Sequence, residues 1–211
     1  MIVFTRRRRR GMKRLALAIG VIVIAAACSS TNPAGPAPIA AGNASTADAK
    51  PSTGVPRTWV AHLGGDNEVP ANPSKGQGQA IFKLSEDGTT VSYRLISSNI
   101  ENIVQAHIHV VTAVGDPTTL NGPISVFLYG LVAPGGGRHD GVLATGEFTA
   151  ANLTNTGSTG VSTLAQLVAA MDGGKTYVNV HTSKDAITGS TGVPGDIPGG
   201  EIRGQIATAG H

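Results

Sequence analysis

Short runs of alternating apolar and polar residues fill the chain from residue 57 onward, and turn-forming residues separate them. Because successive side chains of a strand point to opposite faces of a sheet, this alternation predicts β-strands. The glycine, proline, asparagine and aspartate between the runs predict turns. We expect eight strands, near residues 57–63, 78–85, 90–97, 103–111, 124–130, 142–149, 176–182 and 200–207. This number of short strands favours an all-β fold, an antiparallel Greek-key sandwich or barrel.

One short helix interrupts the strands. Ser162 or Thr163 can cap it, Gly173 follows its last turn, and its apolar residues recur at helical spacing. These residues, which we expect in the core, are Leu164, Leu167, Val168 and Met171. A hairpin turn is expected at residues 86–88, where Gly88 can adopt a positive φ angle.

The composition excludes several classes of protein. Charged residues make up only 14% of the chain and 29 of its 211 residues are glycine, which argues against a helix-rich enzyme or a coiled coil. The single cysteine, Cys28, cannot form an internal disulfide or the paired-cysteine zinc sites. Glycine-rich residues 133–141 lack the lysine of a phosphate-binding loop.

The positive charge of the chain lies at its N-terminus. Seven of the sixteen basic residues precede residue 15, so the chain after residue 27 carries nine basic and thirteen acidic residues, a net charge of −4. Without a basic stripe to neutralise phosphates, we expect no nucleic-acid partner.

The N-terminus has the pattern of a bacterial lipoprotein signal. Basic residues are followed by thirteen apolar or small residues, 15–27, a run too short to cross a bilayer comfortably. The run ends in Ala-Ala-Ala-Cys, which resembles a lipobox whose cysteine, here Cys28, is lipidated after cleavage. A simple secretory signal is the alternative. Translation can start at Met1 or at Met12, because MKRLALAIG is itself a complete signal start.

Three segments follow from these patterns. Residues 1–27 are expected to be the signal peptide, 28–56 a disordered tether and 57–211 the folded domain. The tether carries only Asp48 and Lys50 as charges and has no aromatic residue. The predicted location is the bacterial cell envelope, outside the cytoplasm, with the lipid anchor in a membrane.

The folded segment resembles the CHRD domain, a module of secreted and lipid-anchored bacterial proteins. The segments that carry the likeness, over roughly residues 57–207, are AHLGGDNEVP, GQAIFKLSEDGTTVSYRLISSNIENIVQAHIHV, NGPISVFLYG, YVNVHT and GEIRGQI. The resemblance implies a β-sandwich-like extracytoplasmic module with a poorly defined biochemical role. Two stretches depart from the family pattern, VVTAVGDPTTLNGP after AHIH and about ten extra residues around 187–196.

Strand alternation places the polar residues of three strands on one outer face. Val104, Ala106, Ile108 and Val110 share one side of their strand, so Gln105, His107 and His109 share the other. If the strands are neighbours, a single surface carries His107, His109, His181, Glu201 and Arg203, bordered by Tyr177 and Asn179.

Two histidines two residues apart on a strand can converge on one ion, and imidazole suits copper, zinc, iron or nickel. Glu201 can add an oxygen ligand or orient a ring.

Three classes of function remain open. The first is a non-enzymatic binding or structural module of the envelope that recognises a protein or glycan partner through Tyr177, Asn179, Glu201 and Arg203. The second is a copper- or zinc-binding protein that uses His107, His109 and His181. The third is an oxidoreductase that uses the same metal. A histidine pair of this spacing on a Greek-key strand is similar to copper–zinc superoxide dismutases, so the fold class includes immunoglobulin-like and superoxide-dismutase-like architectures. A solvated polar sheet face is the structural alternative.

Replacement of the lipobox cysteine tests the anchor. We expect Cys28→Ala to release the protein from the membrane fraction or to leave it unprocessed, because the acyl chains are attached to this side chain. Mass spectrometry of the membrane-bound protein should find a lipid-modified cysteine at its first residue. An unmodified chain that begins at another residue would refute the prediction.

Overall fold

The structure is a computed structural model that describes residues 57–112, 118–186 and 190–210. The predicted signal peptide, the tether and Cys28 lie outside the described residues. Within the described ranges, no helix is both long and apolar enough to cross a membrane.

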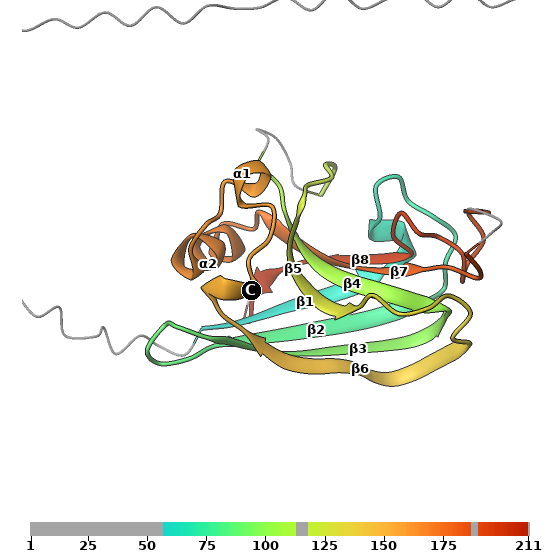
Figure 1. Ribbon diagram of the computed structural model, residues 1–211, viewed down its shortest axis with the longest axis horizontal. Helices are drawn as coiled ribbons and strands as arrows, with labels where there is room; N and C mark the ends of the chain where they lie inside the picture. The colour runs from blue at the N-terminus through green and yellow to red at the C-terminus, as the bar shows by residue number, and fades with distance from the viewer. Residues whose placement is uncertain (1–56, 113–117, 187–189, 211) are drawn as a thin grey trace, which may run out of the picture. The chain divides into compact units, whose positions relative to one another are not determined.

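The described chain forms one antiparallel sheet with a few short helices (Figure 1). Neighbouring strands follow the order β5-β4-β7-β8-β1-β2-β3-β6, and β9 pairs with β1. The strands are β1 (Thr58–Gly64), β2 (Gln77–Leu84), β3 (Val91–Glu101), β4 (Ile103–Val110), β5 (Ile124–Gly130), β6 (Arg138–Phe148), β7 (Thr176–Thr182), β8 (Ile202–Gln205) and β9 (Ala207–Thr208).

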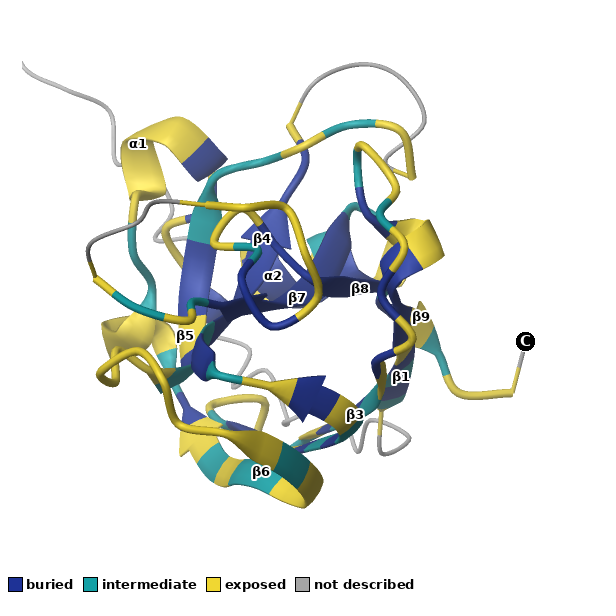
Figure 2. Cartoon of the chain, turned by 90° about the vertical axis from the view of Figure 1, so that its right-hand side faces the viewer, coloured by how far each residue is buried: buried dark blue, intermediate teal, exposed yellow. Residues whose placement is uncertain are grey.

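The sheet curls into a nearly closed barrel, so its strands surround the core (Figure 2). The two edge strands, β5 and β6, approach each other at the seam. A side-chain hydrogen bond links the two sides of this seam: the Tyr93 hydroxyl of β3 donates to the Leu128 carbonyl of β5 at 2.8 Å. Gly146 of β6 leaves room for the Tyr93 ring, since a Cβ atom there would lie 2.9 Å from the hydroxyl oxygen.

The core is lined by the inward residues of the strands and is covered at one end by α2 (Leu164–Asp172). Thr163 caps this helix and forms a capping box with Gln166, which satisfies backbone N–H groups of the first turn. Asp172 connects the helix to β1 by accepting hydrogen bonds from Arg57 and Trp59. The remaining short elements are η1 (Gly65–Asn67), η2 (Ala150–Asn152) and α1 (Thr156–Thr159).

The expected fold class is confirmed. Each of the eight expected strands corresponds to an observed strand, and the expected helix is α2. Gly88 has the positive φ angle expected of the hairpin turn, 71°. The structure adds β9, η1, η2 and α1, and it extends β6 to Arg138, within a glycine-rich stretch that has no apolar alternation.

The pairing of β4 with β7 places the candidate site. Gln105 lies opposite His181, His107 opposite Asn179, and His109 opposite Tyr177. On the other side of β4, the register with β5 shifts next to both histidines, between 106 and 107 and between 108 and 109. Such bulges bend a strand and change the direction of its side chains.

Removal of a large core side chain should destabilise the barrel. Leu167 of α2 is fully buried, so Leu167→Ala should lower the free energy of unfolding by about 2–5 kcal/mol. Val193, which is 60% exposed, provides the control, and Val193→Ala should change stability by less than about 0.5 kcal/mol. Denaturant unfolding measures both; equal effects would contradict the described packing.

Candidate metal centre

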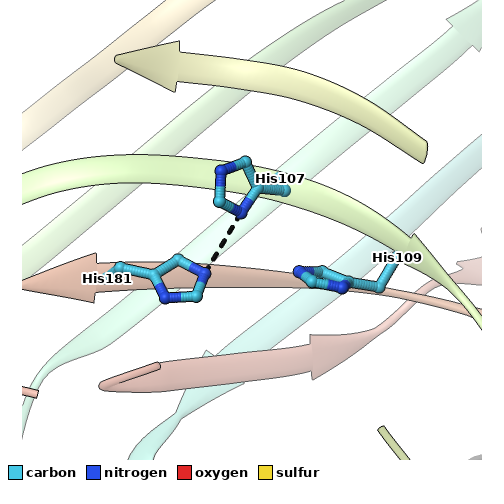
Figure 3. Close-up of side chains that lie close together, drawn as sticks. All are labelled: His107, His109 and His181. Atoms are coloured by element: carbon cyan, nitrogen blue, oxygen red, sulfur yellow. Dashed lines mark hydrogen bonds between the residues drawn. The ribbon is translucent and has the colours of Figure 1, made fainter. Parts of the chain in front are cut away.

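Three histidines from two neighbouring strands converge on the outer face of the barrel (Figure 3). His107 and His109 come from β4 and His181 from β7. One ring nitrogen of each lies within 4.8 Å of the other two. Strand alternation therefore predicted the shared face of these side chains correctly, because β4 and β7 pair without a register shift across this region.

Each imidazole has one ring nitrogen that points away from the other two rings, which we call the outer nitrogen, and one that points toward them, the inner nitrogen. An oxygen acceptor lies at hydrogen-bond distance from each outer nitrogen. Nδ1 of His109 lies 2.8 Å from the Gly122 carbonyl oxygen, and Nδ1 of His181 lies 2.8 Å from that of Pro198. Nε2 of His107 lies 3.2 Å from Oε1 of Gln105. Because these oxygens only accept hydrogen bonds, the outer nitrogens of His107 and His109 donate their N–H groups.

The inner nitrogens face one another. Nδ1 of His107 and Nε2 of His181 lie 3.1 Å apart in a hydrogen bond (Figure 3), while Nε2 of His109 is buried without a hydrogen-bond partner and carries a lone pair. Oδ1 of Asn179 lies 2.9 Å from Nε2 of His181, so both nitrogens of the His181 ring face an oxygen acceptor. Several electron-rich atoms around one point attract a positive charge, either a proton or a metal ion.

Burial disfavours the proton. Together with the neighbouring His181 and His109, it lowers the pKa of His107 to about 3. Burial likewise lowers the pKa of His109 to about 4, against an opposing effect of the hydrogen bond to Gly122. The pKa of His181 is also lowered by burial. All three rings are therefore neutral at pH 7, which is the form that binds metals.

The polar face is covered rather than open to solvent, unlike the solvated surface considered from the sequence. His107, His109 and His181 are 0%, 7% and 6% exposed. The Phe127 ring packs edge-on against His107 with 4.6 Å between centroids. Residues 118–122 and 196–200 supply the carbonyl partners described above. The face is buried because loops fold over it, which strand alternation cannot reveal.

An aromatic stack supports His109. Its ring lies parallel to that of Tyr177, with 4.7 Å between centroids and 1° between planes. The guanidinium carbon of Arg203 lies 3.4 Å from the centroid of the Tyr177 ring, in cation–π geometry. Arg203 is itself held by the Leu120 carbonyl and by Oδ1 of Asn121. The stack thus fixes the plane of the His109 ring.

The other predicted residues divide between two places. Tyr177, Asn179 and Arg203 border the histidines and are at most 4% exposed. Glu201 makes its hydrogen bonds with a different set of residues. Its carboxylate accepts hydrogen bonds from Ser74, Thr182 and the Gly195 N–H. Regular strand structure begins only at Ile202, so alternation does not extend back to Glu201.

Residues from three loops complete the surroundings and were not predicted. Gly122 and Pro198 carry the carbonyl acceptors, and they lie in or beside the two stretches that depart from the family pattern. Glu68 is 7% exposed, and burial raises its pKa to about 7 although Arg203 opposes this. A Cβ atom on Gly200 would lie 2.6 Å from Oε1 of Glu68 and 2.8 Å from Nδ2 of Asn179, so these groups are close neighbours. In the sequence, only the two departures from the family pattern indicated that these loops shape the site.

Comparison with known families identifies the domain. The CHRD domain matches residues 59–187, more than half of the chain, and the matched range contains all three histidines. The chain therefore belongs to the CHRD domain family. No curated protein matches the chain.

The depressed histidine pKa values predict a pH-dependent stability. In the unfolded chain these rings bind protons near pH 6.5, whereas in the folded, metal-free protein His107 and His109 remain neutral until about pH 4 or below. Their contribution is complete above pH 6.5 and is lost as the pH falls. His109→Phe keeps a ring for the Tyr177 stack and removes one titrating group. From pH 7 to pH 5 the wild type should lose about 1–2 kcal/mol more stability than this variant. Equal losses in denaturant titrations with chelator would contradict the assignment.

Proposed function

We propose that this CHRD-domain protein is a lipid-anchored, extracytoplasmic module of the bacterial envelope that binds one copper or zinc ion through His107, His109 and His181. One observation carries the metal assignment. Three neutral imidazoles, each held by an oxygen acceptor at its outer nitrogen, direct their inner nitrogens toward a common point.

The arrangement matches the way proteins hold metal-binding histidines. Such a histidine donates its second N–H to a carbonyl or carboxylate, which fixes the tautomer and the ring orientation. Metal–nitrogen bonds of about 2.0–2.1 Å require ligand nitrogens about 3.3–3.6 Å apart. The His107–His181 pair is already at 3.1 Å, and the largest separation in the set, up to 4.8 Å, must shorten by about 1.2–1.5 Å when the ion binds.

The site favours a non-enzymatic role over an oxidoreductase. The three imidazoles are almost fully buried beneath Phe127 and the covering loops, so a bound ion is shielded from an approaching substrate. Recognition of an envelope protein or a glycan stays a prediction. The burial of Tyr177 and Arg203 favours a role for them in supporting the histidines.

The anchor rests on the sequence. The basic start, the apolar run of residues 15–27 and the Ala-Ala-Ala-Cys motif support lipidation of Cys28. The polar, proline-containing residues 29–56 support a tether between the membrane and the CHRD domain. In this proposal the barrel binds its metal ion outside the cytoplasm.

Metal binding should stabilise the folded protein. With free copper(II) or zinc about 100-fold above its Kd, the melting temperature should rise by about 5–10 °C, because the ion binds only the folded state. His109→Phe should abolish most of the shift. His62→Ala, at an exposed histidine of β1, should retain it. The measurement is differential scanning fluorimetry of full-length protein in detergent. All variants carry Cys28→Ala, because this substitution removes the thiol that would compete for the ion.

Two outcomes would overturn the metal assignment. One is the absence of any shift with zinc, with copper(II) and, under anaerobic reducing conditions, with copper(I). The other is a shift of equal size in wild type and His109→Phe, which would show that the ion binds elsewhere. Failure of this test leaves the lipid anchor untouched, since Cys28→Ala tests that separately.

A further inference from the structure

Building on the metal site proposed above, we infer that its preferred ion is monovalent copper rather than zinc or divalent copper. The inference adds the oxidation state and the selectivity of the site to the proposed function. It rests on the charge of the ligands, on their number and on their burial.

The ligand set supplies no negative charge. All three ligands are neutral imidazoles, and the described cluster contains no carboxylate. The Glu201 carboxylate is already occupied by three donors at another position. Glu68 lies close to Asn179, but the positive Arg203 attracts it and offsets its charge. A bound ion therefore introduces nearly its whole charge into a buried site.

This charge determines which ion costs least to bury. The Born penalty for transferring an ion from water to a low-dielectric interior grows with the square of its charge, so a divalent ion costs about four times as much as a monovalent ion of the same size. Neutral imidazoles donate a lone pair to either ion but neutralise none of its charge, so they offset less of the larger penalty. The charges of Arg203 and Glu68 partly balance each other, so this pair adds little net attraction for either ion.

The number of ligands leads to the same ion. A zinc site with three protein ligands keeps a water molecule as its fourth ligand. Here the His107 side chain is fully buried against Phe127, and His109 is stacked on Tyr177. Copper(I) is stable with two or three ligands and needs no water. Three buried nitrogens packed against Phe127 and Tyr177 therefore suit copper(I) better than zinc.

Competition with chelators tests the preference. Full-length Cys28→Ala protein in detergent is titrated with copper(I) under anaerobic, reducing conditions against a chromophoric copper(I) chelator, and separately with zinc and copper(II) against chelators for those ions. We expect one copper(I) per chain, lost in His109→Phe, with a Kd at least 100-fold below that for zinc or copper(II). Divalent binding of equal or greater affinity would overturn the inference and leave the proposed function intact. Binding of none of the three ions would overturn both.

A pair of isosteric variants isolates the charge. Phe127 is 47% exposed and its ring contacts His107, so a small polar side chain can replace it without a buried cavity. Phe127→Asp and Phe127→Asn differ by one charge beside the site. The Asp variant should shift the ratio of zinc to copper(I) affinity toward zinc by about tenfold relative to the Asn variant. Equal ratios in the two variants would refute the charge argument and, with it, the inference.

Discussion

The pairing of β4 with β7 is the interaction on which the site depends. This pairing sets His109 opposite Tyr177 and His107 opposite Asn179, and it places His181 diagonally across from His107. A slip of one residue would turn the histidines of one strand toward the core. The apolar side chains on the opposite face, among them Ile108 and Val178, prevent that slip because they are fully buried inside the barrel. The hydrophobic core therefore fixes the geometry of the polar cluster outside it.

The cluster acquires its chemistry from the loops around it. On an open sheet face, solvent would stabilise protonated rings. Here the loops that carry Gly122 and Pro198 cover the histidines and at the same time supply carbonyl acceptors. Burial keeps the rings neutral, and the carbonyls direct the remaining lone pairs inward. A surface that would otherwise be merely polar thus becomes a set of converging nitrogen donors.

The sequence predicted what depends on local pattern. Alternation located the strands and the shared face of His107, His109 and His181, and the spacing of Leu164, Leu167, Val168 and Met171 located α2. It could not predict the burial of that face, because residues 118–122 and 196–200, in the connections that follow β4 and β7, have no periodic pattern that fixes their path. It also could not place Glu201, since this residue precedes the regular part of β8. The seam between β5 and β6 depends on overall sheet curvature, which no single segment encodes.

The central claim is that three imidazoles of one barrel face bind the same ion. X-ray absorption spectroscopy of the copper-loaded Cys28→Ala protein tests it most directly. The account predicts three nitrogen neighbours at about 2.0 Å with the multiple scattering of imidazole rings, and no such copper signal from His109→Phe, which loses the ion. A sulfur neighbour, or a copper shell unchanged in that variant, would contradict the account.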